Sequence, residues 1–191
     1  MSDTVYCYPD SDVLVNKLDI KNLDKLHIVE RKLTMLRLSE LLDEPIKGQF
    51  DFQHLKKIHF YIFQDIYTWA GKVRTVDIAK GNMFCNVRFI SEQADKIFLE
   101  LKNEKYLAGL EDDMFIQRLA YYFSEINALH PFREGNGRSQ REFIRSLALK
   151  NGYVIHFEEI SENEMVHASQ KSFLCDYSDM EKLISRCIKR Q

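Results

Sequence analysis

The stretch His130-Pro131-Phe132-Arg133-Glu134-Gly135-Asn136-Gly137-Arg138-Ser139-Gln140-Arg141 joins two helical patterns and carries the densest chemistry of the chain. Pro131 disfavours helical geometry at the preceding residue, so the His130 imidazole is expected on a loop. Gly135 and Gly137 let the backbone turn tightly and bring its N–H groups close to a ligand. The helix that begins there offers unpaired N–H donors and the positive end of its dipole, which is typical of a phosphate site.

Charged residues around these glycines indicate a site for a polyphosphate. Arg138, Arg141 and Arg145 recur at i, i+3 and i+7 on one helix face, which favours contact with more than one phosphate. Glu134 stands where Mg²⁺ is held, because Mg²⁺ takes one or two carboxylates together with phosphate oxygens. His130 is the group of this stretch that moves a proton near neutral pH, and it is the candidate general base for an incoming hydroxyl.

Each of these features has a plainer interpretation when it occurs alone. A lone histidine is usually structural, a Gly-x-Gly is usually a turn, and arginines on a helix face are usually solvated. Phe132 is interpreted as a structural anchor, since burial of its ring would fix the loop. A transition-metal site at His130 and Glu134 is disfavoured because no third ligand lies nearby. The joint occurrence of all these features within one short stretch favours a functional site.

Composition predicts one mainly helical domain. The chain has 191 residues, of which 45% are hydrophobic, and it contains only 7 Gly and 3 Pro. Barrels and sandwiches need many turns, so this scarcity of turn-formers argues against them. The 13 Phe and 9 Tyr supply apolar surface that a disordered chain lacks. The core is expected at about residues 50–175, with an amino-terminal helical extension at about 1–45.

Charge and cysteine content exclude several classes of partner. The formal net charge of −2 argues against direct nucleic-acid binding and against binding to an anionic membrane. No apolar run is long enough for a membrane span, and no signal peptide is recognised at the amino terminus. The cysteines form no C-x-x-C pair, so a zinc site is not expected. We expect them to be reduced thiols in a cytoplasmic protein. They are Cys7, Cys85, Cys175 and Cys187.

Apolar periodicity predicts helices along most of the chain. The first runs from Asn22 to Asp43 and ends before Pro45. Its expected buried stripe is Leu26, Val29, Leu33 and Leu36. Further helices are predicted from Asp51, Ser91, Asp112, Gly137, Ser161 and Ser178. Glu164 and Glu181 would complete capping boxes for the last two.

Residues 73–90 differ from the rest and predict a β-hairpin, the one strand candidate of the chain. Val73, Val76 and Ile78 are β-formers, and Ala79 to Asn82 would form the turn. Met83 to Phe89 would return as the second strand. An isolated hairpin is marginally stable in water, so it must lean on the helices or meet a partner.

The stretch from His130 to Arg141 matches, at every specified position, the Fic-domain signature H-P-F-x-[DE]-G-N-G-R-x-x-R. The segments Phe63–Gly71 and Arg74–Gly81 also resemble the family's helix and flap, and Tyr8–Leu18 resembles the start of Fic toxins. This resemblance covers most of residues 6–150. It implies a mainly α fold, a compact Fic-type helical bundle with one short β-hairpin flap. It also implies AMPylation, the transfer of AMP from ATP to a protein hydroxyl.

The resemblance assigns a role to each matching residue. His130 would deprotonate the hydroxyl of a target Tyr, Thr or Ser, and Glu134 would hold Mg²⁺ between the α- and β-phosphates of ATP. Arg138 would contact the β-phosphate and Arg141 the γ-phosphate. The backbone N–H groups that form the anion hole would be those of Gly135, Asn136 and Gly137.

The resemblance further implies that the flap from Ile78 to Phe84 clamps the main chain of the target by strand addition. Asn82 and Met83 belong to this docking segment. Lys80 and Gly81 would touch the nucleotide.

Two alternatives to an adenylyltransferase remain. Doc-type kinases, which transfer the γ-phosphate, carry lysine at the second signature glycine, and the intact Gly137 therefore favours AMP transfer. The chain would otherwise be a catalytically silent Fic module that binds nucleotide or a partner.

The inhibitory sequence [ST]-x-x-x-E-[GN] of many Fic proteins is not found. The nearest match begins at Ser39 and has Asp43 where Glu is required. We therefore expect a toxin that is inhibited in trans by a small antitoxin pairing with Arg141. Toxins of this type imply a type II topoisomerase subunit as the target.

Overall fold

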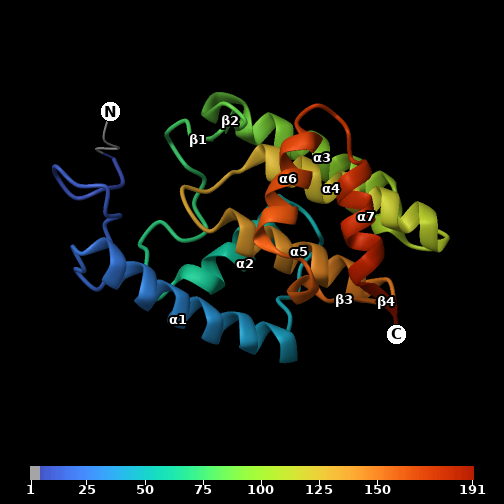
Figure 1. The fold of residues 1–191 in the computed structure, drawn as a ribbon, viewed down its shortest axis with the longest axis horizontal. Coiled ribbons are helices and arrows are strands. Elements are labelled where there is room, and N and C mark those ends of the chain that lie inside the picture. The colour runs from blue at the N-terminus through green and yellow to red at the C-terminus, as the bar shows by residue number, and fades with distance from the viewer. Residues whose placement is uncertain (1–4) are drawn as a thin grey trace.

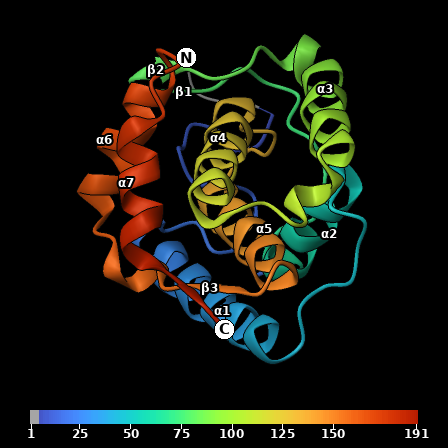
Figure 2. The ribbon, with the colours of Figure 1, turned by 90° about the vertical axis from the view of Figure 1, so that its right-hand side faces the viewer.

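Two helices form the centre of the molecule, and the remaining helices surround them. The computed structural model describes residues 5–191. α4 (Asp112–Leu129) and α5 (Asn136–Lys150) pack against each other in the middle. α2 (Phe52–Phe63) and α3 (Ile90–Asn103) cover one side, and α6 (Glu162–Ser172) and α7 (Ser178–Cys187) cover the other (Figures 1 and 2). α1 (Leu23–Asp43) runs below α2 and α5 (Figure 1). The mainly α fold class is confirmed.

The central helices form where apolar periodicity predicts them. α4 has the predicted bounds, and Phe115, Leu119, Tyr122 and Ile126 on its inner face are at most 1% exposed. α2 begins after Asp51, whose side chain accepts a hydrogen bond from the His54 N–H at 2.7 Å. This N-cap satisfies one of the helix's first N–H groups. The stretch that connects α4 to α5 is thus held between two buried helices.

α1 has the predicted length but a different buried face. Asn22 caps it and it ends at Asp43, before Pro45. The predicted apolar stripe is confirmed only at Leu26, because Leu36 is 57% exposed and Val29 and Leu33 are only half-buried. The side of α1 that faces α5 meets polar groups there, so polar side chains take buried positions. The buried residues of α1 are Leu26, Glu30, Thr34 and Leu41.

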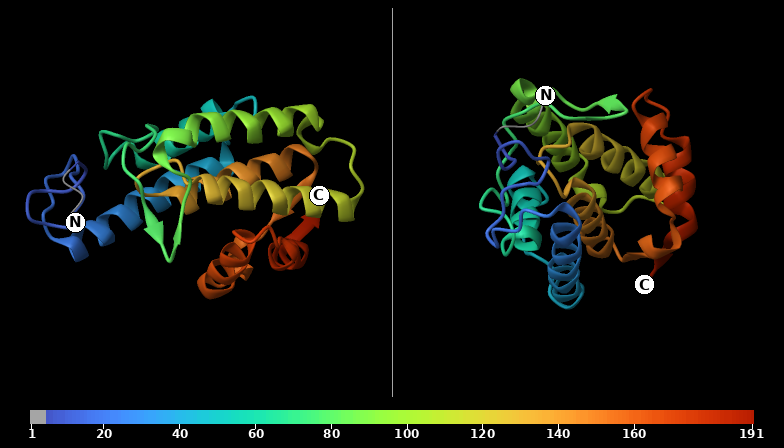
Figure 3. Two further views of the ribbon diagram at one scale, coloured as in Figure 1. Left: turned by 90° about the horizontal axis from the view of Figure 1, so that it is seen from above. Right: turned by 60° about the vertical axis from the view of Figure 1, so that its left-hand side comes forward.

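The hairpin is present but its strands are shorter than predicted and lie elsewhere: they form at the expected turn, Ala79 to Asn82, whereas Val73, Val76 and Ile78 precede the first strand and form no strand themselves. β1 (Ala79–Lys80) pairs antiparallel with β2 (Asn82–Met83), and the hairpin projects from the helices (Figure 3). The predicted strand beyond Met83 is wrong, because Val87–Phe89 forms a 3-10 turn that leads into α3. The Asn86 side chain accepts a hydrogen bond from the Arg88 N–H and starts this turn.

A second two-stranded sheet closes the carboxyl-terminal end and was not predicted. β3 (Tyr153–Ile155) pairs antiparallel with β4 (Ile188–Arg190), after the 3-10 turn Phe157–Glu159 and two helices have intervened. A further 3-10 turn, Lys105–Leu107, follows α3. Strands of three residues are too short to show a period, and this pairing depends on contacts far apart in sequence.

The two predicted capping boxes have different outcomes. Ser161 and Glu164 form the reciprocal hydrogen bonds of a capping box at the start of α6, as predicted. The box at Ser178 is wrong, because Tyr177 occupies the N-cap position of α7 and no side chain caps that helix. Across residues 5–191, no helix has the length and the apolar character needed to cross a membrane.

Candidate active site at the start of α5

His130 ends α4 in a left-handed conformation, with φ 44°, that turns its side chain out of the helix. Its Nδ1 lies 3.1 Å from the Asn127 carbonyl oxygen. Because a carbonyl oxygen only accepts hydrogen bonds, Nδ1 carries the proton and Nε2 keeps a free lone pair. Burial lowers the pKa of His130 to about 4, against the opposing effect of the Asn127 hydrogen bond. At neutral pH the imidazole is therefore neutral and can accept a proton at Nε2.

The loop after His130 is fixed by Phe132 and Asn136. The Asn136 side chain accepts from the Phe132 N–H at 2.8 Å and donates to the Phe132 carbonyl at 2.7 Å. The Phe132 ring is 1% exposed and stacks on the His59 ring, with 3.8 Å between centroids. Asn136 thus closes the turn with its side chain, while its backbone begins α5.

Gly135 and Gly137 meet different surroundings. Gly135 has φ 82°, and a Cβ atom there would lie 2.1 Å from the Phe63 ring. Gly137 is helical, and a Cβ atom there would make an ordinary contact of 3.4 Å with Arg141. The fold therefore requires glycine at 135, whereas at 137 it would accept a Cβ atom in ordinary contact with a guanidinium.

The first turn of α5 presents unpaired donors. No side chain caps this helix, and the N–H groups of Asn136, Gly137 and Arg138 have no partner among residues 5–191. Such N–H groups, with the positive end of the helix dipole, form a binding site for an anion.

Glu134 lies beside this helix end as an ionised carboxylate. It accepts the Gly135 N–H at 2.8 Å and lies 3.5 Å from the Arg138 guanidinium. Burial raises the pKa of Glu134, but Lys80, the Gly135 hydrogen bond and Arg138 together bring it below its usual value. Within the described part of the chain, no group of three or more His, Cys, Asp or Glu side chains is placed to hold a metal. A single carboxylate suits Mg²⁺, which takes its other ligands from phosphates and water.

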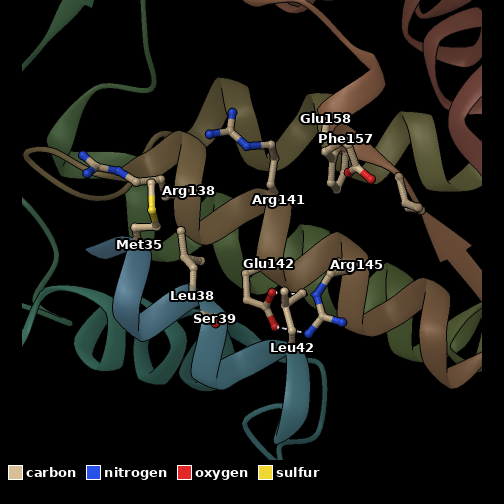
Figure 4. A pocket seen from close by; sticks show the side chains of 11 residues that line it. Met35, Leu38, Ser39, Leu42, Arg138, Arg141, Glu142, Arg145, Phe157 and Glu158 are labelled. Atoms are coloured by element: carbon tan, nitrogen blue, oxygen red, sulfur yellow. Dashed lines mark hydrogen bonds and ion pairs between the residues drawn. The ribbon is translucent and has the colours of Figure 1, made fainter. Parts of the chain in front are cut away.

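Arg141 is a half-buried cation that forms no hydrogen bond or ion pair with any described residue. Burial, and then the charge of Arg138, lower its pKa. Both arginines line a cavity of about 320 Å³ between α5 and α1, and Figure 4 shows them leaving α5 beside Met35 and Leu38. Arg145 lines the same cavity, but its guanidinium pairs with Glu142 at 2.8 Å and donates to the Leu41 carbonyl. Its expected contact with phosphate stays a prediction, and Arg145 would have to leave Glu142 to make it.

The hairpin touches the site through Phe84. The Phe84 ring stacks on the His130 imidazole, with 3.6 Å between centroids and 15° between planes. Ile78 is half-buried, and its carbonyl accepts the Phe84 N–H at 3.3 Å. The residues at the tip are exposed: Lys80, Gly81, Asn82 and Met83. The structure therefore places Phe84, and not the tip, against the catalytic candidate.

Arg74 is a supporting residue that the residue patterns did not reveal. Its fully buried guanidinium donates to the His130 carbonyl at 2.8 Å, to the Val76 carbonyl at 2.7 Å and to the Cys85 carbonyl. It therefore joins the loop to both sides of the hairpin. An arginine among β-forming residues is normally predicted to lie on the surface, so no residue pattern indicated its buried role.

His59 is a second supporting residue. Its Nδ1 accepts the Gly71 N–H at 2.8 Å, so its Nε2 carries a proton and donates to the Glu134 carbonyl at 2.9 Å. Burial lowers the pKa of His59 to about 4. The sequence holds a signal for it, because position 59 falls among Leu55, Ile58 and Ile62 on the buried face of α2.

Several known proteins are similar to this chain in sequence. The model of the Fic/DOC family matches residues 49–148. The protein adenylyltransferase VbhT of Bartonella schoenbuchensis is 44% identical over 97% of this chain, which spans 39% of that protein's length. The probable protein adenylyltransferase Fic of Escherichia coli is 35% identical over 96% of this chain and 91% of its own.

The fold also matches a solved structure. The amino-terminal Fic domain of a VirB-translocated Bep effector protein from Bartonella quintana, solved with bound ADP, superposes with a TM-score of 0.94 at 28% identity. The match covers 98% of this chain and 95% of that domain.

Proposed function

This chain belongs to the Fic/DOC family, and from that premise we propose that it is a protein adenylyltransferase, which moves AMP from ATP to a hydroxyl of a target protein. One observation carries the proposal: a neutral His130 with a free Nε2 stands beside the uncapped start of α5. The names of the relatives and the ADP bound to the Bartonella quintana domain support the same chemistry.

The described residues can perform each step of this transfer. The phosphates of ATP would lie against the N–H groups of Gly135, Asn136 and Gly137, with Arg138 on the β-phosphate and Arg141 on the γ-phosphate. His130 Nε2 takes the proton of the target hydroxyl, whose oxygen attacks the α-phosphorus. The bond to the bridging oxygen of the β-phosphate breaks, and pyrophosphate leaves. Glu134 would hold Mg²⁺, which neutralises phosphate charge when bound.

The hairpin is proposed to dock the target. Its backbone from Ile78 to Phe84 is anchored at both ends by the guanidinium of Arg74 and is exposed at its tip. An extended segment of the target would add to this edge as a further strand. Asn82 and Met83 would contact the target, and Lys80 and Gly81 the nucleotide.

Control in trans by a small antitoxin is proposed on two observations. Arg141 has no ionic partner within residues 5–191, and the cavity beside it is lined by apolar residues of α1. Met35 and Leu42 in this lining are each 63% exposed. An acidic helix would cover them while its carboxylate pairs with Arg141. A purified chain that is inactive by itself would contradict this control.

Transfer of radiolabel from ATP to protein tests which reaction the chain catalyses. The chain is incubated with a cell lysate and ATP labelled on either the α- or the γ-phosphate, and protein-bound label is measured. Label that transfers from the α-position alone is expected. Transfer of γ-label would show a Doc-like kinase, and nucleotide binding without transfer would show a silent module. Type II topoisomerase subunits are the first purified targets to assay.

We propose that the protein acts in the cytoplasm, because ATP is available there.

A further inference from the structure

The buried carboxylate of Glu30, on α1, forms an ion pair with Arg138, one of the two arginines at the site. The Glu30 side chain is 10% exposed, and its Oε1 accepts from Arg138 Nη2 at 2.6 Å. Glu30 lies outside residues 49–148, so the family match does not include it. This contact ties α1 to the start of α5 across more than a hundred residues of sequence.

Neighbouring side chains fix both partners of this pair. Tyr67 donates its hydroxyl to the second Glu30 oxygen, so neither oxygen is free. Thr34, one turn further along α1, accepts from Arg138 Nη1 at 3.2 Å. The guanidinium lies over the Phe63 ring, 4.6 Å from its centroid. Side chains from α1, α2 and the loop after α2 therefore hold Arg138 in one orientation.

The Tyr67 hydroxyl remains a donor under all relevant conditions. Burial, and then the charge of Glu30, raise the pKa of Tyr67 above its usual value. The ring is 1% exposed and stacks on Trp69 with 4.2 Å between centroids. Tyr67 thus anchors the carboxylate, and the carboxylate anchors the arginine.

This arrangement does more than neutralise a buried charge. Arg138 also lies within 3.5 Å of Glu134 and two residues from the uncapped N–H of Asn136. An anion bound by these N–H groups contacts the Arg138 guanidinium only if the Arg138 side chain stays near the axis of α5. An exposed arginine has many rotamers, and fixing one of them before binding removes an entropic cost.

We propose that Glu30 is a positioning residue that orients Arg138 for the phosphate beyond the α-phosphate of the nucleotide. This rests on the proposed function, in which Arg138 contacts the β-phosphate. Glu30 does not touch the nucleotide and acts through the guanidinium alone. It therefore makes tight ADP and ATP binding depend on α1.

The test compares ADP with AMP. Dissociation constants of both nucleotides are measured by calorimetry for the wild type, Glu30→Gln and Glu30→Ala. Loss of the ionic bond should weaken ADP binding by roughly 5- to 30-fold, which corresponds to one charge-assisted hydrogen bond. AMP, which lacks a β-phosphate, should bind as before. Glu30→Gln keeps the shape of the side chain and should have the smaller effect.

The same helix offers a matched control. Glu40 accepts from Arg37 at 3.0 Å and from the Tyr61 hydroxyl at 2.7 Å, which repeats the Arg–Glu–Tyr grouping away from the site. Glu40→Gln should leave both affinities unchanged. In an Arg138→Ala background, Glu30→Gln should cause no additional loss, because its effect passes through that arginine.

The outcomes separate this inference from the proposed function. Unchanged or tighter ADP binding in a folded Glu30→Gln variant overturns the positioning role, and so does an equal loss of AMP and ADP. Absence of ADP binding to the wild type overturns the nucleotide site itself. Circular dichroism of each variant shows whether it is folded.

Discussion

Gly135 and Gly137 stand two positions apart at the start of α5, yet the structure requires only the first. Gly135 has a positive φ and would place a Cβ atom against the Phe63 ring. Gly137 has ordinary helical geometry, and a Cβ atom there would make an ordinary contact with Arg141. A glycine inside a helix is destabilising by about 0.5–1 kcal/mol relative to alanine, so its presence at 137 calls for a reason outside the fold. Room for a phosphate is such a reason.

Alanine substitutions should therefore separate the two glycines. Gly135→Ala should lower the free energy of unfolding by about 1–3 kcal/mol, as expected for an overpacked site. Gly137→Ala should raise it by about 0.5–1 kcal/mol and yet slow AMP transfer by roughly 10- to 100-fold, because the phosphates are displaced. Denaturant unfolding and a transfer assay measure both effects. A Gly137→Ala variant with full activity would refute the phosphate contact.

The acid limb of the pH profile tests the role of His130. A general base must be neutral, and burial lowers the pKa of His130 to about 4. The ratio kcat/KM, which reports on the free enzyme, should thus stay level as the pH falls below 6.5 and decline only near pH 4. Initial rates across this range provide the measurement. A decline centred near pH 6.5 would show that His130 is exposed to water and lacks this environment.

At the scale of single residues, sequence patterns predicted the polar groups that the structure gathers around the start of α5 and missed those packed behind them. His130, Glu134 and Arg138 are polar residues that lie close together in the sequence, so their chemistry can be predicted from the sequence alone. Arg74 and Glu30 are scattered in sequence and reach the site only through tertiary contacts. A buried ion pair leaves no periodic signal in either of its helices.

At the scale of elements, α1 shows how a polar contact changes an apolar pattern. The predicted stripe at Leu26, Val29, Leu33 and Leu36 is rotated from the buried face, which continues from Leu26 to Glu30 and Thr34. Hydrophobic periodicity assumes that the inward face is apolar. Here it faces Arg138 and Tyr67, and Leu36 lies exposed to the solvent. The bounds of the helix were predicted because caps and prolines act locally.

The hairpin supplies one side of the catalytic environment through Phe84. Phe84→Ala should remove the ring from His130, admit water and slow AMP transfer by roughly 10- to 100-fold with little change in ATP affinity. Phe84→Leu, which keeps an apolar cover, should lose less. Phe89→Ala, at a residue 53% exposed on the adjoining 3-10 turn, serves as the control. Equal rates for Phe84→Ala and the wild type would show that the stack has no part in catalysis.

At the scale of the whole molecule, the site is assembled where distant segments meet. α5 provides the uncapped helix start, α4 provides His130, α2 holds the loop through His59, and Arg74 joins the loop to the hairpin. α1 closes the opposite side through Glu30. The mainly helical class followed from composition and periodicity, whereas the β3–β4 pairing depends on the folded chain and was not foreseen.

The central claim is that the chain attaches AMP to protein hydroxyls with His130 as the base. The most direct measurement is mass spectrometry of a lysate treated with ATP and either the wild type or His130→Ala, with a search for AMP on Tyr, Thr and Ser. Adducts should form with the wild type and fall by roughly 10²- to 10⁴-fold with the variant, which should still bind ATP. Adducts formed by His130→Ala at the wild-type rate, or none formed by the wild type, would contradict the account.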